Sequence, residues 1–141
     1  MLEKPPVDRI AARTIARRGF AARVGVIASD MLTDPLPTGY DVHLFSNVLH
    51  DWDVPECERL VARCSAALPR GGRLLIHDAF LNDDLSGPLY PALFSVALMV
   101  ITQGRNYSVA EYKTWLTAAG LKTGEVQPTL VHSSVLVGTK E

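Results

Sequence analysis

Three acidic side chains and one histidine follow runs of the sequence that are typical of β-strands. Glu3 follows a two-residue stub, Asp30 follows the run RVGVIA, and Asp78 ends the run RLLIHD. His50 comes shortly after the run DVHLF. Because ligands of open α/β sheets bind beyond the carboxyl ends of the strands, these four residues form a candidate site. A strand-end acid is also typical of a helix N-cap or a turn, so each one alone predicts little.

His50 has the chemistry of a general base. It lies in the segment Ser46-Asn47-Val48-Leu49-His50, between a strand and a helix that begins near Pro55. A histidine in such a connection can reach the mouth of the sheet, and its ordinary pKa of about 6.5 suits proton transfer. The alternative is a structural histidine that is hydrogen-bonded to a neighbouring carbonyl or carboxylate.

A metal site is not predicted. His50, Asp51 and Asp53 lie close together in the sequence. A tight zinc or iron site usually needs more histidine or cysteine ligands than this segment offers. Cys57 and Cys64 fall on one predicted helix, two turns apart, which is too far for a disulfide.

Composition excludes several classes of protein. The chain has 141 residues, with 14 Lys and Arg against 15 Asp and Glu, so its net charge is −1. Such a balance gives no electrostatic reason to bind nucleic acid or an anionic membrane. Hydrophobic residues make up 48% and charged residues 21%, which indicates a globular chain. The N-terminus has no apolar stretch typical of a signal peptide, so we expect a cytoplasmic protein.

Strands and helices alternate along the chain, which favours an α/β fold with a mostly parallel sheet. The strands are predicted at residues 23–28, 41–45 and 73–78. The helices are predicted at 7–18, with Gly19 as C-cap, at 55–68, at 88–102, and from the capping box at Ser108 to near Gly120. Two final strands, 121–126 and 133–138, are predicted to form a hairpin with Pro128 in its turn.

The predicted helix 88–102 is apolar on nearly all sides. We therefore expect it to be buried, or to line a pocket or an interface. Its apolar stretch, Leu89–Ile101, is shorter than the roughly 20 residues that cross a bilayer, so no membrane span is predicted.

Several segments together resemble one enzyme family. They are the run SNVLHDW at 46–52, the run LPRGGRLLI at 68–76 and the acid Asp78. These features resemble the S-adenosylmethionine-dependent O-methyltransferases of small phenolic molecules, which include plant caffeate-type and bacterial polyketide enzymes. The bacterial branch is nearer, because it favours SNVLHDW. The run Ser29-Asp30-Met31 is similar to the family's GD-[MF] segment, and Pro5-Pro6-Val7 is similar to its D-L-P-x-V segment.

This resemblance implies a cofactor, S-adenosyl-L-methionine, and a small aromatic substrate with a hydroxyl group. It implies that Glu3 holds the ribose and that Asp30 and Met31 contact the adenine. His50 would be the general base, and Asp78 would orient it. Further positions implied at the cofactor are Ser46 and Trp52, and those implied at the substrate are Phe94, Leu98, Met99 and Ile101.

Two residues depart from the family pattern. Asn106 stands where the family's G-x-E-R-[ST] segment has a second acid, within Gly104-Arg105-Asn106-Tyr107-Ser108. Because an amide carries no charge, any contribution of that position to a charged histidine would be weaker. Lys4 replaces an apolar residue beside the ribose acid.

The resemblance implies a partial Rossmann-like class I methyltransferase sheet that ends in a C-terminal antiparallel hairpin. Family sheets have the strand order 3-2-1-4-5-7-6. The chain begins after the N-terminal dimerisation domain and after the glycine-rich first strand, so residues 1–141 are expected to be one truncated methyltransferase domain. Without the central strand, the remaining strand edges are expected to expose unpaired backbone groups.

Three hypotheses follow from this expectation. The chain is a fragment of an O-methyltransferase whose missing half lies upstream. It is a non-catalytic interaction module that binds a partner through its exposed edge or its apolar helix. Or it is a minimal methyltransferase, in which family strands 2 and 4 pair directly or a homo-oligomer completes the sheet.

Overall fold

The computed structural model describes residues 1–141, which divide into two units, Met1–Leu36 and Pro37–Glu141. We describe each unit by itself. In the first unit, β1 (Leu2–Glu3) pairs in parallel with β2 (Ile27–Ala28), and α1 (Val7–Arg17) connects them. The connecting helix ends as predicted, with Gly19 in the left-handed region at φ 77°.

The predicted strand 23–28 is wrong over its first four residues. The backbone N–H groups of Arg23 and Val24 both donate to the carbonyl of Phe20, so this part of the chain is a turn. Only Ile27 and Ala28 have a strand partner, because β1 offers just two residues to pair with.

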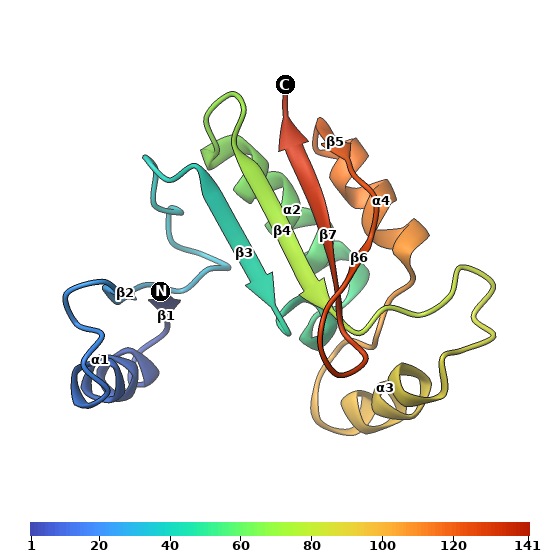
Figure 1. Cartoon of the computed structure of the whole chain (residues 1–141), viewed down its shortest axis with the longest axis horizontal. Helices are drawn as coiled ribbons and strands as arrows, with labels where there is room; N and C mark the ends of the chain where they lie inside the picture. Colours follow the sequence, from blue (N-terminus) through green and yellow to red (C-terminus); the bar gives the residue numbers. More distant parts are fainter. The chain divides into compact units, whose positions relative to one another are not determined.

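The second unit is built on one mixed sheet with the order β3-β4-β7-β5. The strand β3 (Val42–Ser46) pairs in parallel with β4 (Arg73–Asp78), so both carboxyl ends lie at the same edge of the sheet. Figure 1 shows β3 at one edge of this sheet. The side chains of Val42 and Leu44 are exposed, so the face of the sheet on which they lie is uncovered at β3 within the unit.

The C-terminal hairpin is confirmed with one correction. The strand β7 (Ser134–Lys140) runs antiparallel to both β4 and β5 (Leu121–Thr123). Pro128 does not lie in the turn as predicted, because β6 (Gln127–Pro128) also pairs with β7. A proline, which has no backbone N–H, fits in β6 because this two-residue strand donates few backbone hydrogen bonds to β7. The turn of the hairpin falls at residues 129–133.

One face of the sheet is covered by α2 (Val54–Ala67) and α4 (Val109–Ala118), which lie behind it in Figure 1. Asp53 caps α2 by accepting from the Glu56 N–H, and Ser108 and Glu111 form the predicted capping box of α4. The core between these layers contains fully buried apolar side chains, namely Leu60, Val61, Leu74, Ile76, Leu116 and Leu136.

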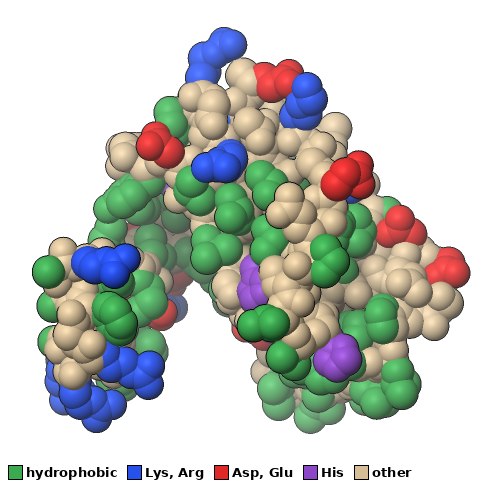
Figure 2. Space-filling view, in the orientation of Figure 1, with side chains coloured by type: hydrophobic (Ala, Val, Ile, Leu, Met, Phe, Trp, Pro, Cys, Tyr) green, Lys and Arg blue, Asp and Glu red, His purple; other side chains and the backbone are tan.

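The apolar helix α3 (Leu89–Ile101) is mostly not buried within this unit. Leu93, Val100 and Ile101 are 61%, 82% and 77% exposed, whereas Pro91 and Leu98 are buried. Figure 2 shows hydrophobic side chains gathered over this helix. The prediction of a buried helix is therefore wrong for most of its surface, while a pocket or interface role stays a prediction. No helix in the structure is long and apolar enough to cross a membrane.

Candidate active site

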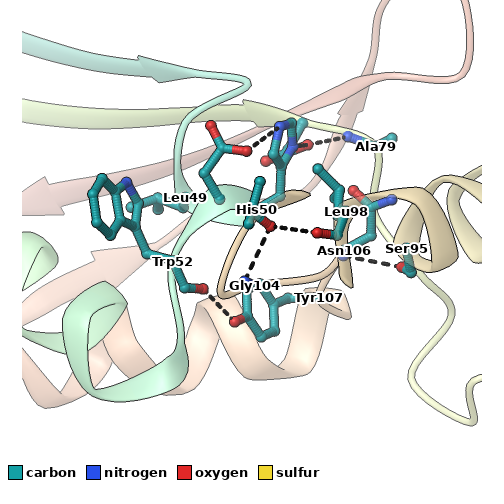
Figure 3. Close-up of polar contacts among 12 residues, drawn as sticks. Leu49, His50, Trp52, Ala79, Ser95, Leu98, Gly104, Asn106 and Tyr107 are labelled. Carbon is teal, nitrogen blue, oxygen red and sulfur yellow. Dashed lines mark hydrogen bonds and ion pairs between the residues drawn. The ribbon is translucent and has the colours of Figure 1, made fainter. Parts of the chain in front are cut away.

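The centre of the candidate site is a buried hydrogen bond between His50 and Asp78. His50 lies in the 3-10 helix η1 (Leu49–Asp51), and Asp78 is the last residue of β4. The distance from His50 Nδ1 to Asp78 Oδ1 is 2.7 Å, and the two side chains are 6% and 2% exposed. The structure thus brings together the histidine and the acid that the sequence analysis placed at adjacent strand ends (Figure 3).

Asp78 is held by two further hydrogen bonds. The backbone N–H of Ala79 donates to its Oδ1 at 2.8 Å, and the hydroxyl of Tyr112 donates to its Oδ2 at 3.3 Å. A buried carboxylate needs such donors, since burial without them is costly. Tyr112 was missed by the sequence analysis, because a tyrosine inside an apolar helix face gives no signal of its own.

These contacts set the chemistry of His50. Burial lowers the pKa of His50, but the hydrogen bond to Asp78 and the charges of Asp78 and Asp51 outweigh it, so the pKa is raised from 6.5. Because a carboxylate only accepts, the hydrogen lies on Nδ1, which leaves Nε2 as the acceptor. The carboxylate of Asp51 is 3.7 Å from Nε2, too far for a hydrogen bond. Nε2 is therefore the atom that can take a proton.

An aromatic side chain borders this histidine. Phe94 on α3 meets the His50 ring edge to face, with 5.4 Å between the centroids, and Tyr90 stacks on Phe94 at 6.1 Å. Leu98 lies one turn further along and is buried, whereas Met99 is 71% exposed. Of the four predicted substrate residues, Phe94 has a ring contact with His50, and Ile101 is 77% exposed.

The loop that carries His50 is fixed by close backbone contacts. A Cβ on Gly104 would collide with the carbonyl oxygen of His50 and would lie 2.7 Å from the backbone nitrogen of Trp52. The Tyr107 hydroxyl donates to the Trp52 carbonyl at 2.6 Å, and the Cys57 thiol donates to the Leu49 carbonyl at 3.1 Å. The sequence analysis missed these supports, since a glycine that permits a close approach looks like any turn glycine.

Ser46 lies at the carboxyl end of β3 on the exposed face of the sheet. Its hydroxyl is 2.8 Å from His77 Nδ1, and the other ring nitrogen of His77 is 3.2 Å from the Thr129 hydroxyl. The half-buried Trp52 ends η1, and its ring lies apart from the His50 ring in Figure 3. A role for either residue at a cofactor stays a prediction.

In the first unit, Glu3 is the last residue of β1, and Asp30 comes two residues after the neighbouring parallel strand β2. The backbone N–H of Ser29 donates to the Glu3 carbonyl, which places both strand ends side by side. Asp30 begins a turn, where its Oδ1 accepts from the Leu32 N–H and its Oδ2 pairs with Lys4 at 2.7 Å. Met31 is half-buried in that turn. No group of three or more His, Cys, Asp or Glu side chains is arranged to hold a metal ion.

Solved structures with this fold include S-adenosylmethionine-dependent methyltransferases. The structure of human N-acetylserotonin methyltransferase with S-adenosylmethionine matches 99% of the chain with a TM-score of 0.90 and 27% identity. The sequence profile of the O-methyltransferase domain matches residues 3–122, and the chain belongs to that family.

More similar relatives come from bacteria. The 3-hydroxy-5-methyl-1-naphthoate 3-O-methyltransferase of Streptomyces sahachiroi is 43% identical over 85% of the chain. The L-tyrosine C(3)-methyltransferase of Streptomyces lavendulae is 36% identical over 99% of it. A family 2 O-methyltransferase of Planctomyces limnophilus, solved in complex with apigenin, covers 99% with a TM-score of 0.94 and 47% identity. The chain spans 35%, 40% and 42% of these three proteins, respectively.

Replacing Gly104 with alanine should displace the loop that carries His50. The added Cβ has no room beside the backbone of His50 and Trp52, so we expect a loss of about 1–3 kcal/mol in the free energy of unfolding, as for overpacked cores. Denaturant unfolding measures it. Gly124→Ala is the matched control, because a Cβ there meets only the Val137 carbonyl at 3.6 Å. Equal effects of both variants would contradict the close approach.

The His50–Asp78 pair should also make stability depend on pH. A histidine whose pKa is raised in the folded state stabilises it fully below its unfolded pKa near 6.5, and this contribution is lost as pH rises through the folded pKa. In Asp78→Asn, burial, which lowers the pKa of His50, is opposed only by the charge of Asp51. We therefore expect the deficit of this variant in unfolding free energy to be larger at acidic pH than at basic pH. A deficit that grows with pH would contradict the pair.

Proposed function

We propose that residues 1–141 are the part of an S-adenosyl-L-methionine-dependent O-methyltransferase that contains the general base, and that the acceptor is the hydroxyl of a small aromatic molecule. The single observation that carries this proposal is the buried His50–Asp78 hydrogen bond, 2.7 Å long, with Nε2 left as a proton acceptor. Membership of the O-methyltransferase domain family supports the reaction class.

The donor and acceptor groups of the first unit suit the adenosine part of the cofactor. Ribose hydroxyls and the adenine amino group donate hydrogen bonds, and the neighbouring carboxylates of Glu3 and Asp30 accept them. The hydroxyl of Ser29, whose backbone N–H donates to the Glu3 carbonyl, is buried and has no hydrogen-bond partner in the protein. We assign Glu3 to the ribose, and Asp30 and Met31 to the adenine.

His50 makes the acceptor oxygen reactive by removing its proton. A phenol has a pKa of about 10, so at neutral pH its oxygen is a weak nucleophile. His50 Nε2 takes the phenolic proton, and Asp78 stabilises the imidazolium that forms through the hydrogen bond at Nδ1. What S-adenosyl-L-methionine supplies when bound is an electrophilic methyl group on sulfur.

An aromatic acceptor fits the surroundings of His50. The rings of Phe94 and His50 are perpendicular, with 5.4 Å between their centroids, so a flat ring whose hydroxyl reaches Nε2 also meets an aromatic side chain. Leu98 and Met99 belong to the same helix and are assigned to the substrate with Phe94. Because a deprotonated phenol is nucleophilic at oxygen and at the neighbouring carbon, the methylated atom has to be identified in the product.

Replacing His50 with glutamine should abolish methyl transfer without loss of the cofactor. We expect turnover of a hydroxynaphthoate to fall by about 10²- to 10⁴-fold, the usual contribution of a general base. Calorimetry with S-adenosylhomocysteine should give the same affinity for both proteins. NMR of the product identifies the methylated atom.

His43→Gln is the matched control, because His43 is a half-buried histidine on β3 whose Nε2 makes no hydrogen bond. It should keep turnover and affinity. Full turnover by His50→Gln would contradict the role of His50. Loss of S-adenosylhomocysteine affinity together with turnover in His50→Gln would contradict a role of His50 in proton transfer alone.

A further inference from the structure

Asn106 is fully buried, and its side chain holds α3. Its Nδ2 donates to the Pro91 carbonyl at 2.8 Å, and its backbone N–H donates to the Ser95 hydroxyl at 3.0 Å. The Ser95 hydroxyl in turn donates to the same Pro91 carbonyl at 2.9 Å. The two bonds from Asn106 fasten the first half of α3, which contains Phe94, to the loop at residues 102–107, and the third bond lies within α3 and links their two acceptors.

The same loop is tied to the segment that contains His50. The backbone N–H of Gln103 donates to the Asp51 carbonyl at 3.2 Å, and Tyr107 donates to the Trp52 carbonyl at 2.6 Å. Figure 3 shows Gly104, Asn106 and Tyr107 of this loop together with His50 and Ser95. The loop therefore joins the two elements whose side chains, His50 and Phe94, meet at the site.

The two ends of the Asn106 amide are used unequally. Its Oδ1 is buried and accepts no hydrogen bond in the protein, while Nδ2 is bonded to Pro91. Exchanging the two atoms would set Oδ1 against the Pro91 carbonyl, which is also an acceptor. A carboxylate at this position would face the same conflict, because it has no hydrogen to donate. The donor is thus the property of Asn106 that the structure uses.

We propose that Asn106 is a positioning residue, which fixes Phe94 against His50 by donating a hydrogen bond to the Pro91 carbonyl of α3. Asn106 acts on the site through α3, so it needs no charge and no contact with the reacting atoms. At the position where the family has a second acid, this chain therefore has a neutral hydrogen-bond donor in place of a negative charge. The consequence for catalysis, though not the positioning itself, rests on the proposed function.

Asn106→Asp tests the donor, since it has nearly the same shape and cannot donate. In the chain without ligands, we expect faster hydrogen exchange of the α3 amides and loss of the nuclear Overhauser contact between the His50 and Phe94 rings. With substrate, KM for the aromatic acceptor should rise roughly threefold to tenfold, the size of one lost hydrogen bond, with kcat nearly unchanged. Asn106→Glu, which restores an acid of the family's type, should also lose the ring contact.

Ser95→Ala tests the second fastening without adding a buried charge. It should give the same changes in exchange and KM, and Ser95→Thr, which keeps the hydroxyl, should reverse most of them. The control is Ser65→Ala on α2, which removes a buried serine hydroxyl that donates to the Ala119 carbonyl. This variant should leave α3 exchange unchanged.

Two results would overturn the proposal. One is an Asn106→Asp or Asn106→Glu protein with higher kcat, unchanged α3 exchange and an intact ring contact, which would make charge the relevant property. The other is normal α3 exchange in both Asn106→Asp and Ser95→Ala. The exchange and ring-contact measurements need no cofactor or turnover, so they are independent of whether methyl transfer itself is confirmed.

Discussion

A carboxylate and an imidazole can be buried together only if each finds partners for its hydrogen-bonding atoms, and this requirement organises the second unit. Asp78 ends a central strand, where the Ala79 N–H and the Tyr112 hydroxyl donate hydrogen bonds to its carboxylate. His50 reaches it from a short 3-10 helix that follows the neighbouring parallel strand. The parallel pairing of β3 and β4 therefore brings His50 and Asp78 to the same edge of the sheet, and α4 contributes the Tyr112 hydroxyl.

Around this pair, a close backbone approach and several hydrogen bonds set the position of the loop at residues 102–107. Gly104 lies against the carbonyl of His50, and the loop after α3 is bonded both to the His50 segment and to α3 itself. Small errors in this loop would move the imidazole relative to Phe94. Since proximity and orientation account for much of a transfer reaction's rate, the loop matters for chemistry although none of its side chains needs to react.

The strand-end acids and the histidine could be predicted from sequence, because apolar runs followed by polar residues mark carboxyl ends of buried strands. The third strand was predicted with correct bounds, since β4 is buried between two neighbours, whereas residues 23–26 looked like a strand but have no partner. The exposure of α3 and the tight approach at Gly104 could not be predicted. The exposure of α3 and the approach at Gly104 both depend on which parts of the chain pack against these residues, and the hydrophobic pattern of the sequence does not contain that information.

The role of His50 as a base depends on which ring nitrogen carries its hydrogen, and ¹⁵N NMR of the histidine rings in the folded chain tests this directly. We expect the neutral imidazole of His50 to have its hydrogen on Nδ1, with Nε2 unprotonated, and to titrate with a midpoint above 6.5. A neutral ring with its hydrogen on Nε2, or a midpoint below 6.5, would contradict the account. In that case Nε2 would not be the proton acceptor, and Asp78 would not be holding the imidazolium.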